Sequence, residues 1–234
     1  QIIFAGIQSI ANATIQHYEI LIIDECHLVA PNESGQYHSL ISKLKEVNPD
    51  LKILGLTATP YRLDSGYLTE WDNPIFEQVA YKIDVKLLIK RGFLCPVVSN
   101  GGGVKVDVSK VKHKGGEFLD SALESLYMSK TPEIVQDIIK QGARRKAWLV
   151  FCVSIEHAEQ VTNELKSHGV NAACYHSQSD NEYILDDFSN GRLRCLVNVN
   201  ILTTGSNFPI ADMCVLIRAT ESTALYVQIV GRVM

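Results

Sequence analysis

Short apolar runs alternate along this chain with longer stretches of helical spacing, and this alternation limits the possible folds more than any other feature. Runs rich in Val, Ile and Leu predict buried strands at residues 19–23, 51–56, 147–153, 195–199 and 213–217. Amphipathic stretches predict helices at residues 37–47, 131–141, 155–168 and 182–190, and Gly169 and Gly191 are placed to end two of them. The alternation predicts an α/β protein with parallel sheets and helices on both faces.

The alternation is interrupted near the middle of the chain, which predicts two α/β lobes. A short helix is expected at residues 85–92, and the run Asn100-Gly101-Gly102-Gly103 breaks the pattern after it. We expect a first lobe over residues 1–84, a connecting segment over residues 85–130 and a second lobe over residues 131–234. The glycine run is not a P-loop, because it lacks the Gly-Lys-Ser/Thr ending that handles phosphates and magnesium.

Composition excludes several classes of protein. The chain is 46% apolar and 21% charged, which suits a globular protein with a sizeable core. Its six cysteines form no CxxC pair and mostly lie in apolar runs, so we expect reduced core residues of a cytoplasmic protein, without a zinc site or disulfides. No apolar run approaches the roughly 20 residues that would span a membrane.

The charge balance restricts how the chain could hold nucleic acid. The formal net charge is −4, which is not the basic balance of a protein that grips nucleic acid by bulk electrostatics. Two local basic clusters, Arg144-Arg145-Lys146 and Arg192 with Arg194, are candidates for contact. Each cluster follows a helical stretch, so the alternative is that these cations lie near helix C-termini and interact with the helix dipole.

Two acids follow the first predicted strand, in the run Leu21-Ile22-Ile23-Asp24-Glu25-Cys26-His27. Ligands of open parallel sheets bind at the carboxyl ends of strands. An Asp there can hold Mg²⁺ through water, while a neighbouring Glu polarises the attacking water in phosphoryl transfer. The alternative for the acidic pair is a solvated turn. A metallohydrolase site of Asp24, Glu25 and His27 is disfavoured, because neighbours on a strand point to opposite faces.

A second polar motif follows the next predicted strand, in the run Gly55-Leu56-Thr57-Ala58-Thr59-Pro60. Two small hydroxyls flank an alanine, and Pro60 stops the strand, so the turn is suited to bond the acid and His27 of the neighbouring strand. The two motifs together are far more specific than either motif alone.

Asp-Glu-Cys-His and Thr-Ala-Thr-Pro resemble motifs II and III of superfamily-two helicases of the DEAD/DEAH-like group. Other segments resemble further motifs of that group in the expected order: Ile7-Gln8-Ser9 resembles the strand-contacting motif Ib, residues 148–157 motif IV, residues 196–209 motif V and residues 228–232 motif VI. The resemblance covers essentially the whole chain. It is closest to bacterial RadD-type DNA-repair ATPases, followed by motor subunits of type I and type III restriction enzymes.

The resemblance implies two tandem RecA-like lobes in an ATP-dependent helicase or translocase, which is an ATP hydrolase that uses ATP and Mg²⁺. It implies nucleic acid as the partner, DNA in preference to RNA, and a role in DNA repair. No P-loop occurs in the 234 residues, and motif VI stops at Met234 before its expected second arginine. We therefore expect an active parent protein, an inactive piece, and a truncated first lobe with one face and one edge of its sheet poorly covered.

Site residues follow from the resemblance, position by position. It assigns Mg²⁺ coordination through water to Asp24, water activation to Glu25, and contact with the phosphates to Gln228 and Arg232. It assigns coupling of nucleotide state to lobe closure to His27, Thr57 and Thr59, nucleotide binding to Gly205 and Gly231, and nucleic-acid binding to Gln8, Ser9, Thr203 and Thr204. Charge on a transferring phosphoryl group also calls for an arginine finger, which is an independent reason for Arg232.

Two departures and two rival interpretations accompany the resemblance. Asn207 stands where the family usually has an acid, and residues 176–188 are a few residues shorter than usual. The rivals are the motor subunit of a restriction enzyme and a non-hydrolysing RecA-like scaffold that binds nucleic acid. Retention of Asp24, Glu25 and Arg232 argues against a scaffold. For Ser9 and Thr204, the alternative to nucleic-acid contact is that they cap helices.

Overall fold

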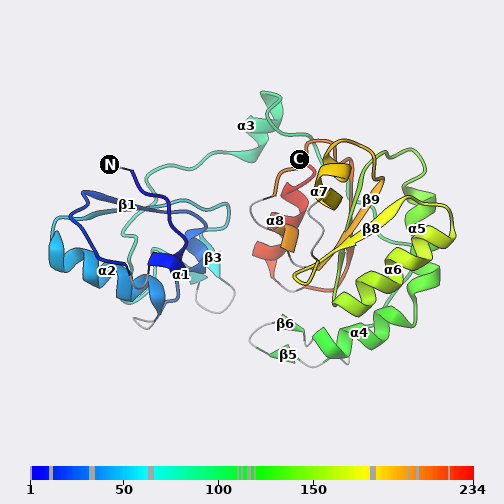
Figure 1. The fold of residues 1–234 in the computed structure, drawn as a ribbon, viewed down its shortest axis with the longest axis horizontal. Coiled ribbons are helices and arrows are strands. Elements are labelled where there is room, and N and C mark those ends of the chain that lie inside the picture. Colours follow the sequence, from blue (N-terminus) through cyan, green and yellow to red (C-terminus); the bar gives the residue numbers. More distant parts are fainter. Residues whose placement is uncertain are drawn as a thin grey trace. The chain divides into compact units, whose positions relative to one another are not determined.

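The chain forms two compact units, Gln1–Lys82 and Ile83–Met234, each with its own parallel sheet and apolar core (Figure 1). The α/β class with parallel sheets is confirmed. The computed structural model describes residues 2–10, 13–31, 35–62, 66–109, 111, 113–114, 117–118, 120–179, 183–199, 201–203, 206–220 and 222–234.

The first unit is built on one parallel pair of strands. Strand β1 (Ile20–Ile23) pairs with β2 (Lys52–Gly55), and α2 (Gln36–Val47) connects them. One face of α2 carries the buried residues of this helix, Leu40, Ile41 and Leu44. The remaining elements of the unit are short: α1 (Ile7–Ile10), the 3₁₀ helix η1 (Cys26–Leu28), β3 (Tyr61–Arg62) and β4 (Gly66–Tyr67).

Among the described residues, one face of the β1–β2 pair is poorly covered. Ile20, Ile22, Leu54 and Leu56 are 57%, 59%, 43% and 48% exposed. Successive side chains of a strand point to opposite faces, and Ile23 of the other face is buried in a cluster with Ile41 of α2. The expectation of a poorly covered face in the first sheet is therefore confirmed.

The second unit has a four-stranded parallel sheet in the order β10-β7-β9-β8. Its strands are β7 (Trp148–Cys152), β8 (Ala172–Tyr175), β9 (Cys195–Asn198) and β10 (Met213–Ile217). Its helices are α3 (Val85–Lys90), α4 (Asp120–Met128), α5 (Thr131–Gln141), α6 (Ile155–Ser167), α7 (Tyr183–Ser189), the 3₁₀ helix η2 (Ile201–Thr203) and α8 (Thr223–Gly231). A small hairpin pairs β5 (His113–Lys114) with β6 (Glu117–Phe118).

Apolar side chains cover both faces of this sheet, which explains why its strands lack polar alternation. On one face, Trp148 and Val150 pack in a cluster with residues of α5 and α6. On the other face, Leu149 and Phe151 pack with Phe188 of α7 and residues of α8. Every residue of β7 and β9 is buried.

The predicted strands and helices all form, with ends shifted by a residue or two. Gly169 and Gly191 have φ values of 78° and 71°, the left-handed conformation expected of glycines that end helices. The elements that were not predicted include β8, α4 and α8, besides the short pieces α1, β3 to β6 and the two 3₁₀ helices. Strand β8 is short and lies at the edge of its sheet, and α8 is apolar on almost every side, so neither shows the period that identifies an element.

Residues 83–130 belong to the second compact unit. Helix α4 packs against α6, and Leu123 of α4 is fully buried in a cluster with Val111 and Val153. That residues 85–130 act as a connecting segment stays a prediction.

Two further features are the length of the described helices and the state of the cysteines. Within the described ranges, no helix is long and apolar enough to cross a membrane. All six cysteines are free thiols; Cys26, Cys152 and Cys195 are buried, and Cys95 is exposed.

A histidine without exposed surface lies beneath α4. His157 of α6 is fully buried, and its ring stacks on Tyr127 with centroids 5.9 Å apart. Neither ring nitrogen has a hydrogen-bond partner in the described part of the chain. Burial lowers the pKa of His157 from 6.5 to about 4, although the negative charge of Glu124 opposes the shift. The ring is therefore neutral at pH 7.

This pKa predicts an acid-sensitive second unit. The unfolded chain binds more protons than the folded chain between the two pKa values of His157, 6.5 and about 4. The free energy of unfolding should therefore fall as the pH drops through that window, by up to about 3 kcal/mol. Native-state hydrogen exchange of the β7 amides would measure it. His157→Phe should flatten the dependence, whereas His168→Asn at the exposed end of α6 should keep it. An equally steep dependence in His157→Phe would contradict the assignment.

Candidate functional site

The two acids lie in a tight turn directly after β1. Asp24 is exposed, and its Oδ1 accepts a hydrogen bond of 2.9 Å from the backbone N–H of Glu25. Glu25 has φ 49° and ψ 46°, and within the described ranges no other residue except glycine has a positive φ. A left-handed backbone costs a non-glycine residue about 1–2 kcal/mol, and such strain clusters at functional sites.

The loop after β2 runs alongside this turn. The register pairs Ile23 with Gly55, and the backbone N–H of Leu56 donates to the carbonyl of Ile23 at 2.9 Å. The backbone N–H of Cys26 donates in turn to the carbonyl of Leu56 at 3.0 Å. A Cβ at Gly55 would lie 2.7 Å from the Cys26 sulfur and 2.6 Å from the Phe76 ring, so only glycine permits this close approach.

A histidine joins the acidic turn to the hydroxyl loop. His27 Nδ1 and Thr57 Oγ1 share a hydrogen bond of 2.9 Å, and His27 Nδ1 lies 3.3 Å from Glu25 Oε2. Thr57 Oγ1 also accepts from the backbone N–H of Thr59 at 3.0 Å. Burial lowers the pKa of His27, and this outweighs the opposing charge of Glu25. A neutral imidazole thus lies between Glu25 and Thr57, and the predicted bond between the hydroxyl loop and His27 is present.

Thr59 and Cys26 pack beneath the polar groups. Thr59 is fully buried, and its hydroxyl has no hydrogen-bond partner in the described part of the chain. Burial raises the pKa of the Cys26 thiol to about 11, so the thiol between the two acidic positions and His27 stays protonated at neutral pH. Cys26 therefore fills space beside Gly55 and supplies no thiolate to a metal or substrate.

The exposed Asp24 carboxylate fits a magnesium ion that arrives with a nucleotide. Mg²⁺ keeps several waters and binds through one or two carboxylates together with substrate phosphates. One oxygen of Asp24 is held by the Glu25 N–H, and the other makes no hydrogen bond within the described ranges. The same ranges contain no group of three or more His, Cys, Asp or Glu that could hold a metal by themselves.

The residues of the upstream motif lie on α1. Gln8 and Ser9 are both exposed. Ser9 lies inside α1, and its hydroxyl makes no hydrogen bond to any described residue, so the alternative that Ser9 caps this helix is not supported. Its role in nucleic-acid binding stays a prediction.

In the second unit, motif V lies against motif VI. Arg232 follows α8 as its C-cap, and its guanidinium donates to the Ser206 carbonyl. Leu202, Phe208 and Ile229 share one apolar cluster, which fixes the motif V loop on α8. Gln228 is half-buried on α8, and Gly231 is exposed at the end of the helix.

Parts of the predicted nucleic-acid and nucleotide contacts are not described. Thr204 and Gly205 lie outside the described residues, and so does the side chain of Thr203 at the end of η2. Asn207, which stands where the family usually has an acid, is exposed in the same loop. The motif IV residue Ser154 caps α6 by accepting from the His157 N–H at 3.1 Å.

Two family models and several relatives match the chain. The helicase conserved C-terminal domain matches residues 130–234, and the res subunit of type III restriction enzymes matches residues 1–62. The putative ATP-dependent helicase IRC3 of Saccharomyces cerevisiae is 29% identical over 224 residues, which is 91% of this chain and 31% of that protein. The chain carries a superfamily-two helicase core.

Solved structures agree with this assignment. A fragment of a putative HsdR subunit of a type I restriction enzyme from Vibrio vulnificus has a TM-score of 0.60 and 25% identity, and the match covers 92% of this helicase core and 40% of that chain. Dbp5 of S. cerevisiae, bound to RNA and ADP BeF3, has a TM-score of 0.51 at 17% identity, which shows the shared fold. The match to Dbp5 covers 94% of the helicase core and 51% of the Dbp5 chain.

The helicase core spans only part of its relatives. It covers 31% of S. cerevisiae IRC3 and 36% of the putative mitochondrial ATP-dependent helicase irc3 of Schizosaccharomyces pombe, to which it is 27% identical over 92% of its own length. The RecA-like α/β fold of both matched regions is the fold of ATP-dependent helicases.

Proposed function

We propose that this helicase core belongs to a motor that couples ATP hydrolysis to movement along nucleic acid. The observation that carries the proposal is the position of His27, whose Nδ1 shares a hydrogen bond of 2.9 Å with Thr57 Oγ1 and lies 3.3 Å from Glu25 Oε2. A scaffold that never hydrolyses ATP has no need of a strained acid held beside a neutral histidine. A motor needs such a connection, because a change at the hydrolysing group must alter the protein around it.

The proposal gives the residues the roles that the resemblance implies. Glu25 polarises the attacking water. Asp24 would hold Mg²⁺, which would neutralise charge on the phosphates when bound. His27 contacts both Glu25 and Thr57, so a change in the charge around Glu25 alters the Thr57 hydrogen bond. Thr57 in turn holds the backbone of Thr59, and the loop after β2 moves with it. Gln228 and Arg232 act on the phosphates.

We propose DNA as the substrate, and a role in DNA repair of the RadD type. The matches to restriction-enzyme subunits support DNA, since restriction enzymes act on DNA. The same matches favour a second candidate function, the motor subunit of a restriction enzyme. An assay for DNA cleavage by the longer protein separates the two, because a repair motor should leave DNA intact.

ATP hydrolysis by the full-length protein tests the proposed function. We expect single-stranded or duplex DNA to raise the rate by about tenfold or more, and RNA to raise it less. The 234-residue core alone should hydrolyse no ATP, because it lacks the P-loop whose backbone amides and lysine supply much of the binding energy. If neither DNA nor RNA stimulates hydrolysis in the full-length protein, the proposed motor function is wrong.

A double substitution in the full-length protein tests the path of nucleic acid. Gln8→Ala with Thr204→Ala should weaken single-strand binding and reduce DNA stimulation of the ATPase. These short neutral donors suit hydrogen bonds to a phosphodiester backbone, which position a strand without reading its sequence. Affinity should depend weakly on salt, equivalent to about two to four neutralised phosphates. Basal hydrolysis and melting temperature should stay unchanged.

A matched control is Gln16→Ala with Gln136→Ala, two exposed polar residues outside the motifs. This control should bind and hydrolyse like the unmodified protein. If the Gln8 and Thr204 variant binds normally, or if its loss of binding follows its loss of stability, these residues are structural and nucleic acid lies elsewhere.

A further inference from the structure

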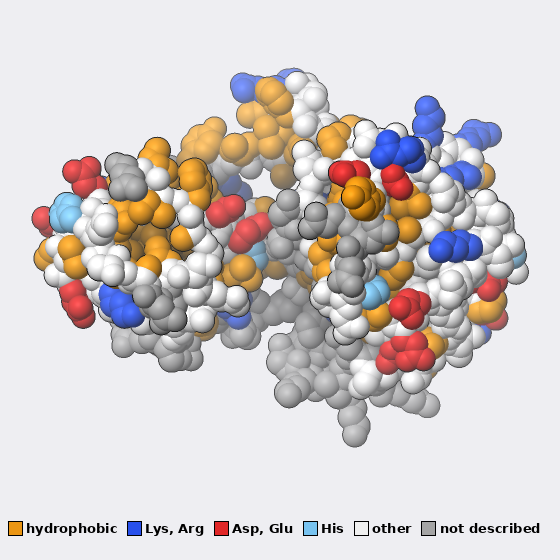
Figure 2. Space-filling view, viewed as in Figure 1, with side chains coloured by type: hydrophobic (Ala, Val, Ile, Leu, Met, Phe, Trp, Pro, Cys, Tyr) orange, Lys and Arg blue, Asp and Glu red, His pale blue; other side chains and the backbone are white. Residues whose placement is uncertain are grey.

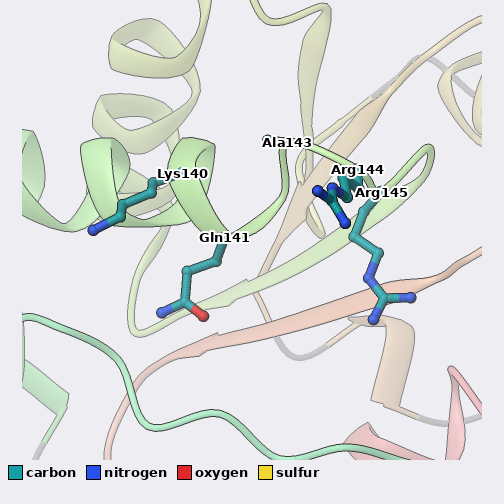
Figure 3. A pocket seen from close by; sticks show the side chains of 5 residues that line it. All are labelled: Lys140, Gln141, Ala143, Arg144 and Arg145. Carbon is teal, nitrogen blue, oxygen red and sulfur yellow. The ribbon is translucent and has the colours of Figure 1, made fainter.

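A basic hollow lies at the end of α5 in the second unit, outside the motif residues of that unit. It has a volume of about 450 Å³ and is lined by Lys140, Gln141, Ala143, Arg144 and Arg145 (Figure 3). Lys140 and Gln141 come from the last turn of α5, and the two arginines from the loop that leads into β7. The hollow therefore lies at the amino end of β7, whereas motifs IV, V and VI follow the carboxyl ends of strands.

Side chains from elsewhere in the unit hold the loop of this hollow. Arg194 donates to the carbonyls of Gly142 and Arg145 at 3.2 and 3.1 Å, and its guanidinium lies 4.4 Å from the centroid of the Trp148 ring. Trp148 Nε1 donates to the Arg145 carbonyl at 3.2 Å. The Asp212 carboxylate accepts from the backbone N–H of Lys146 at 2.9 and 3.0 Å.

The turn that follows α5 and leads to Arg144 and Arg145 also requires a glycine. A Cβ at Gly142 would lie 2.5 Å from the Trp148 ring, so the loop passes too close to this ring for any side chain. The Arg145 N–H donates back to the Gly142 carbonyl at 2.9 Å. The backbone that presents the arginines is therefore fixed before any ligand binds, which lowers the entropic cost of binding.

Among the described residues, the three cations of the hollow and the adjoining Lys146 have no hydrogen-bond or ion-pair partner. Lys140, Arg144, Arg145 and Lys146 are exposed, and in the described part of the chain none of their side chains makes a hydrogen bond or an ion pair. Two acids that contact this region are engaged by other groups: Asp212 by the loop backbone, and Asp137 by the Gly103 N–H and Gln141. Unpaired charges of one sign that share a hollow repel one another unless an anion binds.

The second basic cluster of the sequence, Arg192 with Arg194, is bound by other groups of the protein. This argues against the alternative that Arg144 and Arg145 serve only to interact with a helix dipole. Arg192 pairs with Asp187 at 2.7 Å, and Arg194 binds the carbonyls just beyond the end of α5. Arg194 thus supplies the positive charge expected near a helix C-terminus. Arg144 and Arg145 are not needed for that purpose. Figure 2 shows Lys and Arg side chains spread over the surface of the second unit, in a chain of net charge −4.

We propose that this hollow binds the phosphodiester backbone of nucleic acid as a second contact, separate from the motif residues. Two guanidinium groups suit phosphate oxygens, which they bind in bidentate fashion. None of the lining residues is aromatic or a large apolar residue, so the surface offers neither a platform for bases nor the anchor that a protein partner needs. Binding is therefore independent of sequence. Only the choice of nucleic acid over other polyanions rests on the proposed function.

Charge neutralisation in the 234-residue core tests this contact. The triple variant Lys140→Gln, Arg144→Gln and Arg145→Gln should raise the Kd for a labelled DNA duplex at least about tenfold near 50 mM salt. The slope of log affinity against log salt should fall by about two to three. Fluorescence anisotropy measures both. Lys86→Gln with Lys90→Gln and Lys105→Gln removes the same charge from exposed positions outside the hollow, and should leave both quantities nearly unchanged.

Each contrary result overturns the inference in a recognisable way. The hollow binds no nucleic acid if the unmodified core fails to bind the duplex at low salt, or if both triple variants lose affinity equally. Polyglutamate that displaces the duplex as well as unlabelled DNA does, at equal charge, would assign the hollow to acidic proteins. This assay needs no ATP hydrolysis, so failure of the proposed motor function would leave its result unaffected.

Discussion

Glu25→Gln in the full-length protein should lower the rate of ATP hydrolysis by about 10³-fold and leave ATP binding intact. A glutamine has nearly the same size, and its amide can still reach His27, which lies 3.3 Å from the present carboxylate. It cannot polarise the attacking water or accept its proton, and loss of such a base costs about 10²- to 10⁴-fold. Steady-state hydrolysis and binding of a fluorescent ATP analogue measure the two effects.

A second variant at this position distinguishes a catalytic role of Glu25 from a purely structural role. Glu25 has φ 49°, which glycine adopts without strain, so Glu25→Gly should make the first unit more stable by about 1 kcal/mol while hydrolysis is lost. A purely structural role would make activity follow stability instead. Glu19→Gln, an exposed acid just before β1, is the control and should hydrolyse ATP normally. Unchanged turnover in Glu25→Gln would remove Glu25 from its assigned role.

Arg232→Ala should lower hydrolysis by roughly 10³-fold while ATP still binds, which is the scale of a lost arginine finger. Arg232 follows the last turn of α8, and its guanidinium binds the Ser206 carbonyl of motif V, so it is held in place before nucleotide arrives. Arg232→Lys should recover only part of the rate, because an ammonium keeps the charge but not the planar fork.

Stability measurements complete the test of Arg232. Its contact with Ser206 also joins two motifs, so part of any effect could be structural. Arg192→Ala, which removes an exposed ion pair with Asp187, is the control. Exposed pairs contribute only about 0–1 kcal/mol, and this variant should hydrolyse ATP normally. A melting temperature of Arg232→Ala that falls in step with activity would make Arg232 a structural residue.

The sequence by itself determined the class of fold and the contact between the two polar motifs of the first unit. Strands such as β7 and β9 are buried on both faces, so their apolar runs could be recognised without the structure. Gly169 and Gly191 marked helix ends for a backbone reason that holds in any fold. The contact between His27 and Thr57 followed from two parallel strands whose carboxyl ends meet at one edge.

Only the tertiary structure decided which charged and strained groups are available for chemistry. Glu25 has a left-handed backbone in a turn whose next residue, Cys26, is bonded to the loop after β2, and no local pattern encodes this approach. Arg144 and Arg194 look alike in the sequence, as cations after helices. The Arg194 guanidinium donates a hydrogen bond to the carbonyl of Gly142, 52 positions away, whereas Arg144 has no partner among the described residues. A side chain is free or engaged according to what folding brings near it, and those neighbours come from distant parts of the chain.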